Sequence, residues 1–126
     1  MFCVDYELKQ CEFGLGVFTK QFIPKGATVF RMTVISVMTM SVEAFDRLEP
    51  AAQDHVRKYA YGDANTGIVY LPVLHDMFLN HSDDPNIRKL EGTEDDVAVR
   101  DIHPGEQIFC DYRELDTMGT FCSSFL

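Results

Sequence analysis

Short strand-like segments separated by glycine and proline turns are the feature that most restricts how this chain can fold. Residues 12–18 place two glycines, Gly14 and Gly16, in a turn between apolar positions. A second turn follows, in which Pro24 fixes the backbone and Gly26 closes the turn. Residues 27–40 are rich in valine, isoleucine, threonine, phenylalanine and methionine, a composition that favours one or two strands. Residues 1–40 are therefore predicted to be β-rich.

One helical region is predicted, over residues 41–60. Ser41 can cap its first turn and Pro50 suits the first turn of a second segment, so the region is either two short helices or one kinked helix. Three further segments have the composition of short strands, namely residues 68–71, 97–100 and 107–110. The outline is an α+β fold that is mainly β, with its functional residues on loops.

The length of the chain sets the number of domains. Its 126 residues are enough for one domain and too few for two independent cores. Hydrophobic residues make up 46% of the sequence and charged residues 25%, a globular mixture that excludes wholesale disorder. We therefore expect residues 1–126 to fold as a single domain.

The charge balance is strongly acidic, with a formal net charge of −9. Such a surface repels phosphate backbones and attracts basic peptides, so we expect no direct nucleic-acid binding. No apolar stretch reaches the roughly 20 residues that a membrane span needs, so no membrane contact is expected. The N-terminus lacks a basic region followed by an apolar core, which argues against a signal peptide and for an intracellular location.

No metal site is expected from the cysteines and histidines. The four cysteines lie at positions 3, 11, 110 and 122. None of them forms a C-x-x-C pair, which structural zinc sites usually use, so we expect reduced and mostly buried thiols. His75, Asp76, His81 and His103 offer metal-binding groups, but the interval from His75 to His81 fits neither a helical turn nor strand alternation.

The polar stretch over residues 80–86 carries the most information about function. It follows the apolar residues 77–79 directly, so Asn80 and His81 are expected at the edge of the core. Buried amides and imidazoles need hydrogen-bond partners, and an adenine ring would offer donors, acceptors and a stacking face. A solvated loop rich in turn-forming residues is the alternative interpretation.

Two further patterns offer candidate chemistry. Gly14-Leu15-Gly16 would let the backbone approach a ligand closely because glycine has no Cβ, although a plain turn or bulge also fits the pattern. The third glycine and the helix of a dinucleotide-binding motif are missing. Asp111 and Tyr112 end the last apolar strand, where the tyrosine hydroxyl would point either into a site beyond the sheet or into solvent.

Taken together, these patterns resemble the SET domain, the fold of one class of protein-lysine methyltransferases. Residues 14–26 resemble its G-x-G block with the following I-x-x-G turn, residues 78–86 its N-H-S-x-x-P-N block, and residues 97–112 its G-E-x-(I/L)-x-x-D-Y block. The blocks occur in the family's order and span most of the chain. The resemblance implies small curved β-sheets, with the C-terminal segment threaded under a preceding loop as a pseudoknot.

The resemblance also implies how the single domain is divided. The expected parts are an N-terminal β part (1–36), a short variable insert (37–75), a C-terminal β part with the knot (76–112) and a tail (113–126). The chain is similar to compact, stand-alone viral and bacterial members, since it lacks the cysteine-rich segments that build flanking zinc modules in many relatives. Phe121 and Phe125 of the tail, or a second subunit, would close the substrate channel instead.

By this resemblance, the chain is a protein-lysine N-methyltransferase that uses S-adenosyl-L-methionine. The backbone of residues 14–16 would hold the amino-acid end of the cofactor, and Asn80 and His81 would contact it, with His81 near the adenine. Tyr112 would lie where cofactor and substrate lysine meet and would orient the amine and the methyl group. The expected substrate is a lysine-containing protein such as a histone tail, and no metal is needed. The alternative is a non-catalytic SET-fold module that binds peptide or cofactor.

Self-association into a homodimer is a further expectation. Phe121, Phe125 and Leu126 leave large apolar groups near the C-terminus, and exposed groups of that kind often mark interfaces. The alternative is that the tail folds back over the chain's own substrate channel.

Overall fold

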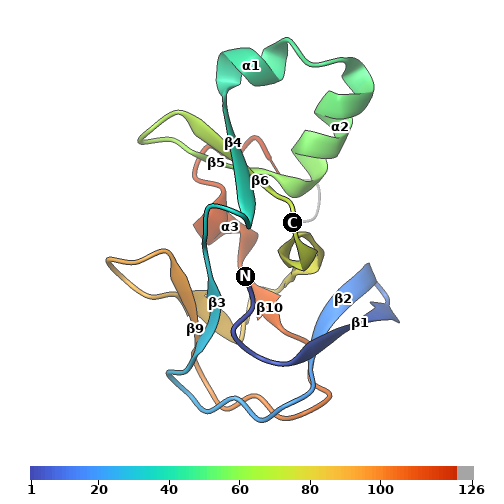
Figure 1. The fold of residues 1–126 in the computed structure, drawn as a ribbon, viewed down its shortest axis with the longest axis vertical. Helices are drawn as coiled ribbons and strands as arrows, with labels where there is room; N and C mark the ends of the chain where they lie inside the picture. The colour runs from blue at the N-terminus through green and yellow to red at the C-terminus, as the bar shows by residue number, and fades with distance from the viewer. Residues whose placement is uncertain (122–126) are drawn as a thin grey trace.

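The computed structural model describes residues 1–121 of the chain. Within them, short strands form four small sheets, three antiparallel and one parallel, and the helices are short (Figure 1). The prediction of an α+β fold that is mainly β is confirmed. None of the helices in residues 1–121 has the length and apolar composition of a membrane span.

The N-terminal hairpin joins β1 (Tyr6–Cys11) to β2 (Gly14–Thr19), which pair antiparallel from Tyr6 opposite Thr19 to Cys11 opposite Gly14. The turn predicted within residues 12–18 lies at the start of that stretch, and Gly16 is not part of it. The turn lies at residues 12–13, and Gly14 ends it with a φ of 96°, a backbone conformation that strongly favours glycine. The rest of the Gly-x-Gly pattern is therefore strand.

A three-stranded sheet forms the centre of the fold, with the order β3 (Thr28–Arg31), β9 (Asp95–Ala98) and β8 (Ile87–Lys89). Next to it, the backbones of Ile23 and Ile102 exchange two hydrogen bonds of 2.8 Å, which join the two turns that follow these residues. Both side chains are almost fully buried in the larger apolar core. The core therefore holds the N-terminal and C-terminal parts together.

The insert carries α1, α2 and its own sheet at one end of the molecule (Figure 1). The sheet has the order β4 (Val37–Ser41), β6 (Ile68–Pro72) and β5 (Tyr61–Asp63). Between β4 and β5, α1 (Val42–Asp46) and α2 (Pro50–Tyr59) are separate helices, so the first of the two helical alternatives is correct. Ser41 caps α1 by accepting a hydrogen bond of 3.0 Å from the Ala44 N–H, and Pro50 begins α2.

The C-terminal part brings distant segments together. After the 3₁₀ helix η1 (His75–Phe78), β7 (Asn80–His81) pairs in parallel with β10 (Phe109–Cys110), and α3 (Tyr112–Leu115) follows. The polar stretch therefore lies beside the last strand, as the resemblance implied, although that strand is shorter than the predicted 107–110. The reason is Asn86, whose side chain bonds the Gln107 carbonyl and the Phe109 N–H, each at 2.8 Å, in place of strand partners.

Candidate active site

Asn80 and the Gly-x-Gly strand meet on one side of the N-terminal hairpin. The Asn80 amide donates hydrogen bonds to the Leu15 carbonyl at 3.1 Å and to Gln107 Oε1 at 2.8 Å. A Cβ on Gly16 would lie 2.5 Å from that Gln107 oxygen and 3.1 Å from Asn80 Nδ2. Gly16 is thus required by the close approach of two amides, whereas Gly14 faces open space and is required by its backbone angle.

Gln107 and Cys11 belong to this cluster and were missed in the sequence. Cys11 Sγ lies 3.8 Å from Gln107 Oε1 and 3.7 Å from Asn80 Nδ2. The signal for Gln107 was an amide inside an otherwise apolar segment, where a buried polar group needs a partner. No sequence pattern indicated a role for Cys11, because its contacts with Gln107 and Asn80 exist only in the folded chain.

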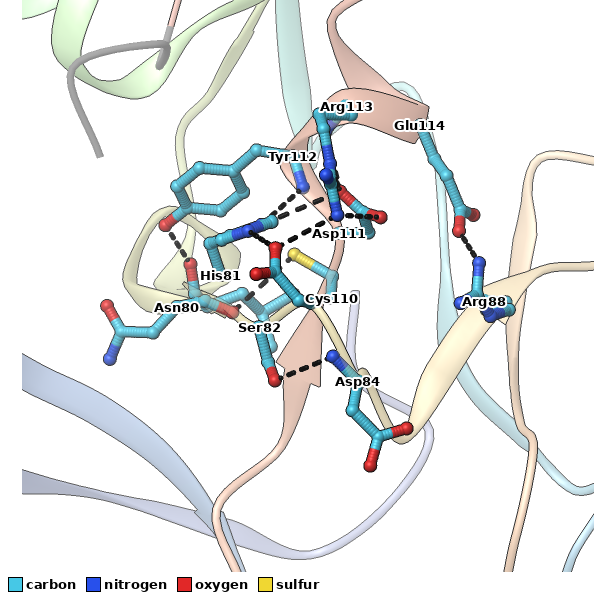
Figure 2. A network of polar contacts seen from close by, with 12 residues as sticks. Asn80, His81, Ser82, Asp84, Arg88, Cys110, Asp111, Tyr112, Arg113 and Glu114 are labelled. Carbon is cyan, nitrogen blue, oxygen red and sulfur yellow. Dashed lines mark hydrogen bonds and ion pairs between the residues drawn. The ribbon is translucent and has the colours of Figure 1, made fainter. Parts of the chain in front are cut away.

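His81 connects the polar stretch to Tyr112. Its Nδ1 accepts a hydrogen bond of 3.1 Å from the backbone N–H of Tyr112, and its Nε2 lies 3.0 Å from Asp83 Oδ1. Since Nδ1 is an acceptor, the proton of the neutral ring lies on Nε2 and is donated to Asp83. The imidazole ring of His81 and the ring of Tyr112 lie against each other, with centroids 5.3 Å apart (Figure 2). His81 therefore fixes the position of Tyr112 through its main chain.

Asp111 and Arg113 complete the polar network around His81 (Figure 2). Asp111 caps α3 and accepts hydrogen bonds from the Arg113 backbone N–H and Nε, at 2.9 and 3.0 Å. The Arg113 hydrogen bonds hold the pKa of the Asp111 carboxyl below its usual value. Arg113 Nη2 also lies 2.9 Å from Asp83 Oδ1, so the network closes on itself. It stabilises the backbone at the point where Tyr112 leaves the strand.

The Tyr112 side chain points away from this network into the protein. Its hydroxyl donates a hydrogen bond of 2.6 Å to the Leu79 carbonyl (Figure 2). The ring packs against both apolar clusters, the central one and that of the insert. Of the two interpretations of the sequence, the structure therefore has the hydroxyl inside the protein and engaged, not in solvent.

Tyr112 lines a cavity of about 60 Å³ between the central sheet and the insert. Much of its wall is apolar and includes Met32, Tyr61, Met77, Leu79 and Leu115. Burial raises the pKa of the Tyr61 hydroxyl, as expected in a poorly solvated space. A long aliphatic side chain with a polar end fits such a wall.

Two poorly solvated carboxyl groups share this cavity with Tyr112, and the exposed Glu94, which is paired with Lys89, also lies on its wall. Asp76 and Asp96 both line it, and burial raises the pKa of each to about 6. Asp96 was missed in the sequence, where an acidic pair inside a strand pattern was the available signal. Asp76 was considered only as a metal ligand beside His75.

Phe121, one of the two phenylalanines predicted to close the channel, is not part of the cavity wall. Phe121 is 2% exposed and packs edge-on against Phe45, with ring centroids 5.4 Å apart. Its N–H donates to Asp116 Oδ2 at 2.8 Å, while Asp116 Oδ1 accepts from the Gly62 N–H at 2.9 Å. The tail therefore folds back onto the insert as far as residue 121. Phe125 lies outside the described residues.

The histidines considered as metal ligands have other contacts. His75 Nδ1 lies 2.9 Å from the Tyr6 hydroxyl, and His103 lies against the Phe22 ring. Within residues 1–121, no three or more histidine, cysteine and acidic side chains gather as a metal site would need. Within residues 1–121, Cys3, Cys11 and Cys110 are not joined to one another, and of these three only Cys110 is buried.

Comparisons with known proteins find similar folds. The fold is similar to the crystal structure of a candidate histone methyltransferase from Plasmodium falciparum, with a TM-score of 0.58 and 21% identity over 86% of this chain and 93% of that one. It is also similar to a chain of an active polycomb repressive complex 2 in its basal state, with a TM-score of 0.69 and 20% identity over 94% of this chain and 17% of that one.

At these identities the structural matches show the fold alone. A comparison with curated proteins finds no significant match. The sequence itself matches the SET domain over residues 14–113, which is most of its length and contains all three motif blocks. The chain belongs to the SET domain family.

Proposed function

We propose that the chain is a protein-lysine N-methyltransferase that uses S-adenosyl-L-methionine. The observation that supports this most is the double role of Tyr112. Its main chain is hydrogen-bonded to His81 in the polar network, and its side chain lines a largely apolar cavity and bonds the Leu79 carbonyl there. A tyrosine in this position joins a surface suited to a polar cofactor to a cavity suited to an aliphatic amine.

The residues on the cofactor side fit S-adenosyl-L-methionine. Gly14 leaves open space where a side chain would stand, and the nearby Phe13 and Leu15 expose large apolar surfaces that a ring can contact. Leu15 to Gly16 would hold the amino-acid end, with Asn80 keeping that backbone in place, and His81 would lie near the adenine. When bound, the cofactor supplies a methyl group on a sulfonium.

The residues on the substrate side fit a lysine side chain. The aliphatic stem would lie along the apolar wall, and the nitrogen would reach the end near Tyr112. The Tyr112 hydroxyl donates to the Leu79 carbonyl, and a hydroxyl oxygen is also able to accept an N–H from the amine. Tyr112 would therefore orient the nitrogen, and positioning of this kind supplies much of the rate in a displacement reaction. We further propose a basic protein segment such as a histone tail as substrate.

The experiment is methyl transfer from labelled S-adenosyl-L-methionine to a lysate, followed by identification of the labelled residues. We expect label on lysine side chains. Tyr112→Phe should lower the rate by about 100-fold or more while cofactor affinity is kept, because the ring still packs. The lost hydrogen bond to Leu79 should cost about 0.5–1.5 kcal/mol of stability, which a melting curve measures.

A wild-type rate in Tyr112→Phe would reject the catalytic role of Tyr112. If the unaltered protein binds cofactor and transfers nothing, the alternative of a non-catalytic SET-fold module is correct. That alternative shares all the binding contacts, so only turnover separates the two.

The proposed homodimer needs a different surface from the one first considered. Phe121 is buried within the chain and cannot serve as an exposed contact. The exposed apolar side chains on and before β4 can do so, since Val34 is 96%, Ile35 62% and Met38 58% exposed. Light scattering at micromolar concentration should give a dimer mass, and a monomer mass throughout would reject the proposal.

A further inference from the structure

The carboxyl groups of Asp76 and Asp96 are not needed for the role of Tyr112, yet both line its cavity. They come from elements far apart in the sequence. Asp76 lies in η1, directly before the segment that leads to Asn80, and Asp96 lies in β9 opposite Phe30 of β3. The fold therefore brings two acidic side chains to one small, largely apolar space.

Neither carboxyl group forms an ion pair with the residues that the structure describes, although the charge of Lys89 offsets part of the rise in the pKa of Asp96. Asp76 Oδ1 is buried and has no hydrogen-bond partner in residues 1–121. Next to Asp96, the two available cations are taken by other carboxylates: Arg31 Nε lies 3.5 Å from Asp95, and Lys89 Nζ lies 2.9 Å from Glu94. The N-terminal amine offsets part of the cost at Asp76, whose pKa still rises to about 6.

Lys58 and Lys89 both line the cavity, and because Lys89 is paired with Glu94, Lys58 is left as one ammonium group for Asp76 and Asp96. Its side chain is exposed and lies over the Tyr59 ring, 5.2 Å from the centroid. At neutral pH both aspartates are mainly ionised, since pH 7 lies above a pKa of about 6. An uncompensated charge in a poorly solvated space is costly, and a cationic occupant would remove that cost.

We propose that Asp76 and Asp96 are specificity-determining residues that make this cavity select a cationic side chain, so that lysine is first captured as its ammonium ion. The inference rests on the proposed function in taking lysine as the occupant. It adds that binding of the lysine side chain depends on the negative charges of Asp76 and Asp96. This binding step precedes methyl transfer and is independent of it. Capture itself forms and breaks no covalent bond.

Two small probes with the same aliphatic stem test the inference: Nα-acetyl-lysine methylamide and Nα-acetyl-norleucine methylamide, which lacks the ammonium group. Each is titrated into the ¹⁵N-labelled full chain, and binding is followed by the shifts of backbone amide signals around the cavity. We expect the lysine probe to bind the unaltered protein about tenfold or more tightly than the norleucine probe, as for a hydrogen bond to a charged group. Asp76→Asn and Asp96→Asn should each reduce this preference, and the double variant should abolish it.

Two further variants serve as controls. Asp54→Asn removes a carboxylate that is 80% exposed on α2 and paired with Arg57, and it should leave the preference unchanged. Lys58→Gln removes the competing internal cation and should strengthen lysine binding. The dispersion of each variant's spectrum shows that it is folded, and the two single variants keep the test valid if the double variant does not fold.

An equal affinity of both probes for the unaltered protein, or a preference that survives in both folded single variants, would overturn the inference. The proposed function fails in a different way. Calorimetry with S-adenosyl-L-methionine and the transfer assay test it separately, so a charge preference without methyl transfer would reject the methyltransferase and keep the cation-selective cavity.

Discussion

Replacing Asp96 with asparagine should make the folded protein more stable at neutral pH. Burial raises the pKa of this carboxyl from its ordinary 3.8 to about 6 in the folded state. Between these two pH values the folded chain therefore binds more protons than the unfolded chain, and the free energy of unfolding falls as the pH rises. Below about pH 3.8 the penalty is absent, and above about pH 6 it is complete.

The size of the penalty follows from the two pKa values. Their difference, multiplied by about 1.4 kcal/mol per pH unit, gives about 3 kcal/mol. An asparagine amide keeps the shape of the side chain but carries no charge, so it escapes this penalty. It must still bury a polar group, which offsets part of the gain. We expect Asp96→Asn to raise the free energy of unfolding by about 1–3 kcal/mol at pH 7.5 and by almost nothing at pH 4.

Urea unfolding at pH 7.5 and pH 4, followed by circular dichroism, measures this difference. Asp54→Asn is the matched control, because its exposed carboxylate should change stability by less than about 0.5 kcal/mol at either pH. An equal gain at both pH values would refute the reasoning, since packing or hydrogen bonding would then be the cause. A loss of stability at pH 7.5 would show that Asp96 has a favourable partner in the folded state.

Three further predictions concern the cofactor side and the core. Gly16→Ala must displace the Gln107 amide, so we expect a loss of about 1–3 kcal/mol in stability and weaker S-adenosyl-L-methionine binding, measured by melting and calorimetry. Asn86→Ala leaves the Gln107 carbonyl and the Phe109 N–H without their partner and should cost about 2–4 kcal/mol in urea unfolding; an unchanged midpoint would contradict this. Cofactor binding should survive chelator treatment, whereas a loss that zinc restores would reveal a metal site.

The motif spacing allowed a good prediction of which segments meet. The polar stretch from Asn80 and the strand that ends at Cys110 lie side by side because each has residues that complete the other's hydrogen bonds. The family resemblance supplied that pairing, since polarity alone also fitted a solvated loop. Ser41 and Pro50 were read correctly because helix caps and first-turn prolines act within a few residues.

Contacts between distant residues could not be predicted in the same way. The raised pKa values of Asp76 and Asp96 depend on the surface that covers them, and that surface comes from three parts of the chain. Phe121 was assigned to the channel because an aromatic tail suits one. Its observed position is set by its contact with Phe45 on α1 and by the carboxylate of Asp116, which bonds Phe121 through one oxygen and Gly62 through the other. No sequence pattern near Phe121 predicts either contact.

The bonds of Asp116 also bear on the order in which the protein can fold. One carboxylate accepts from Gly62 in the insert and from Phe121 near the end of the chain, over separations of 54 and 5 residues. The parallel pairing of β7 with β10 likewise can form only after residues 109–110 have left the ribosome. A nascent chain can form its N-terminal hairpin early, because β1 and β2 are neighbours in sequence. The site around Tyr112 is then assembled last, so a partly synthesised chain lacks the arrangement that we propose for binding cofactor and substrate together.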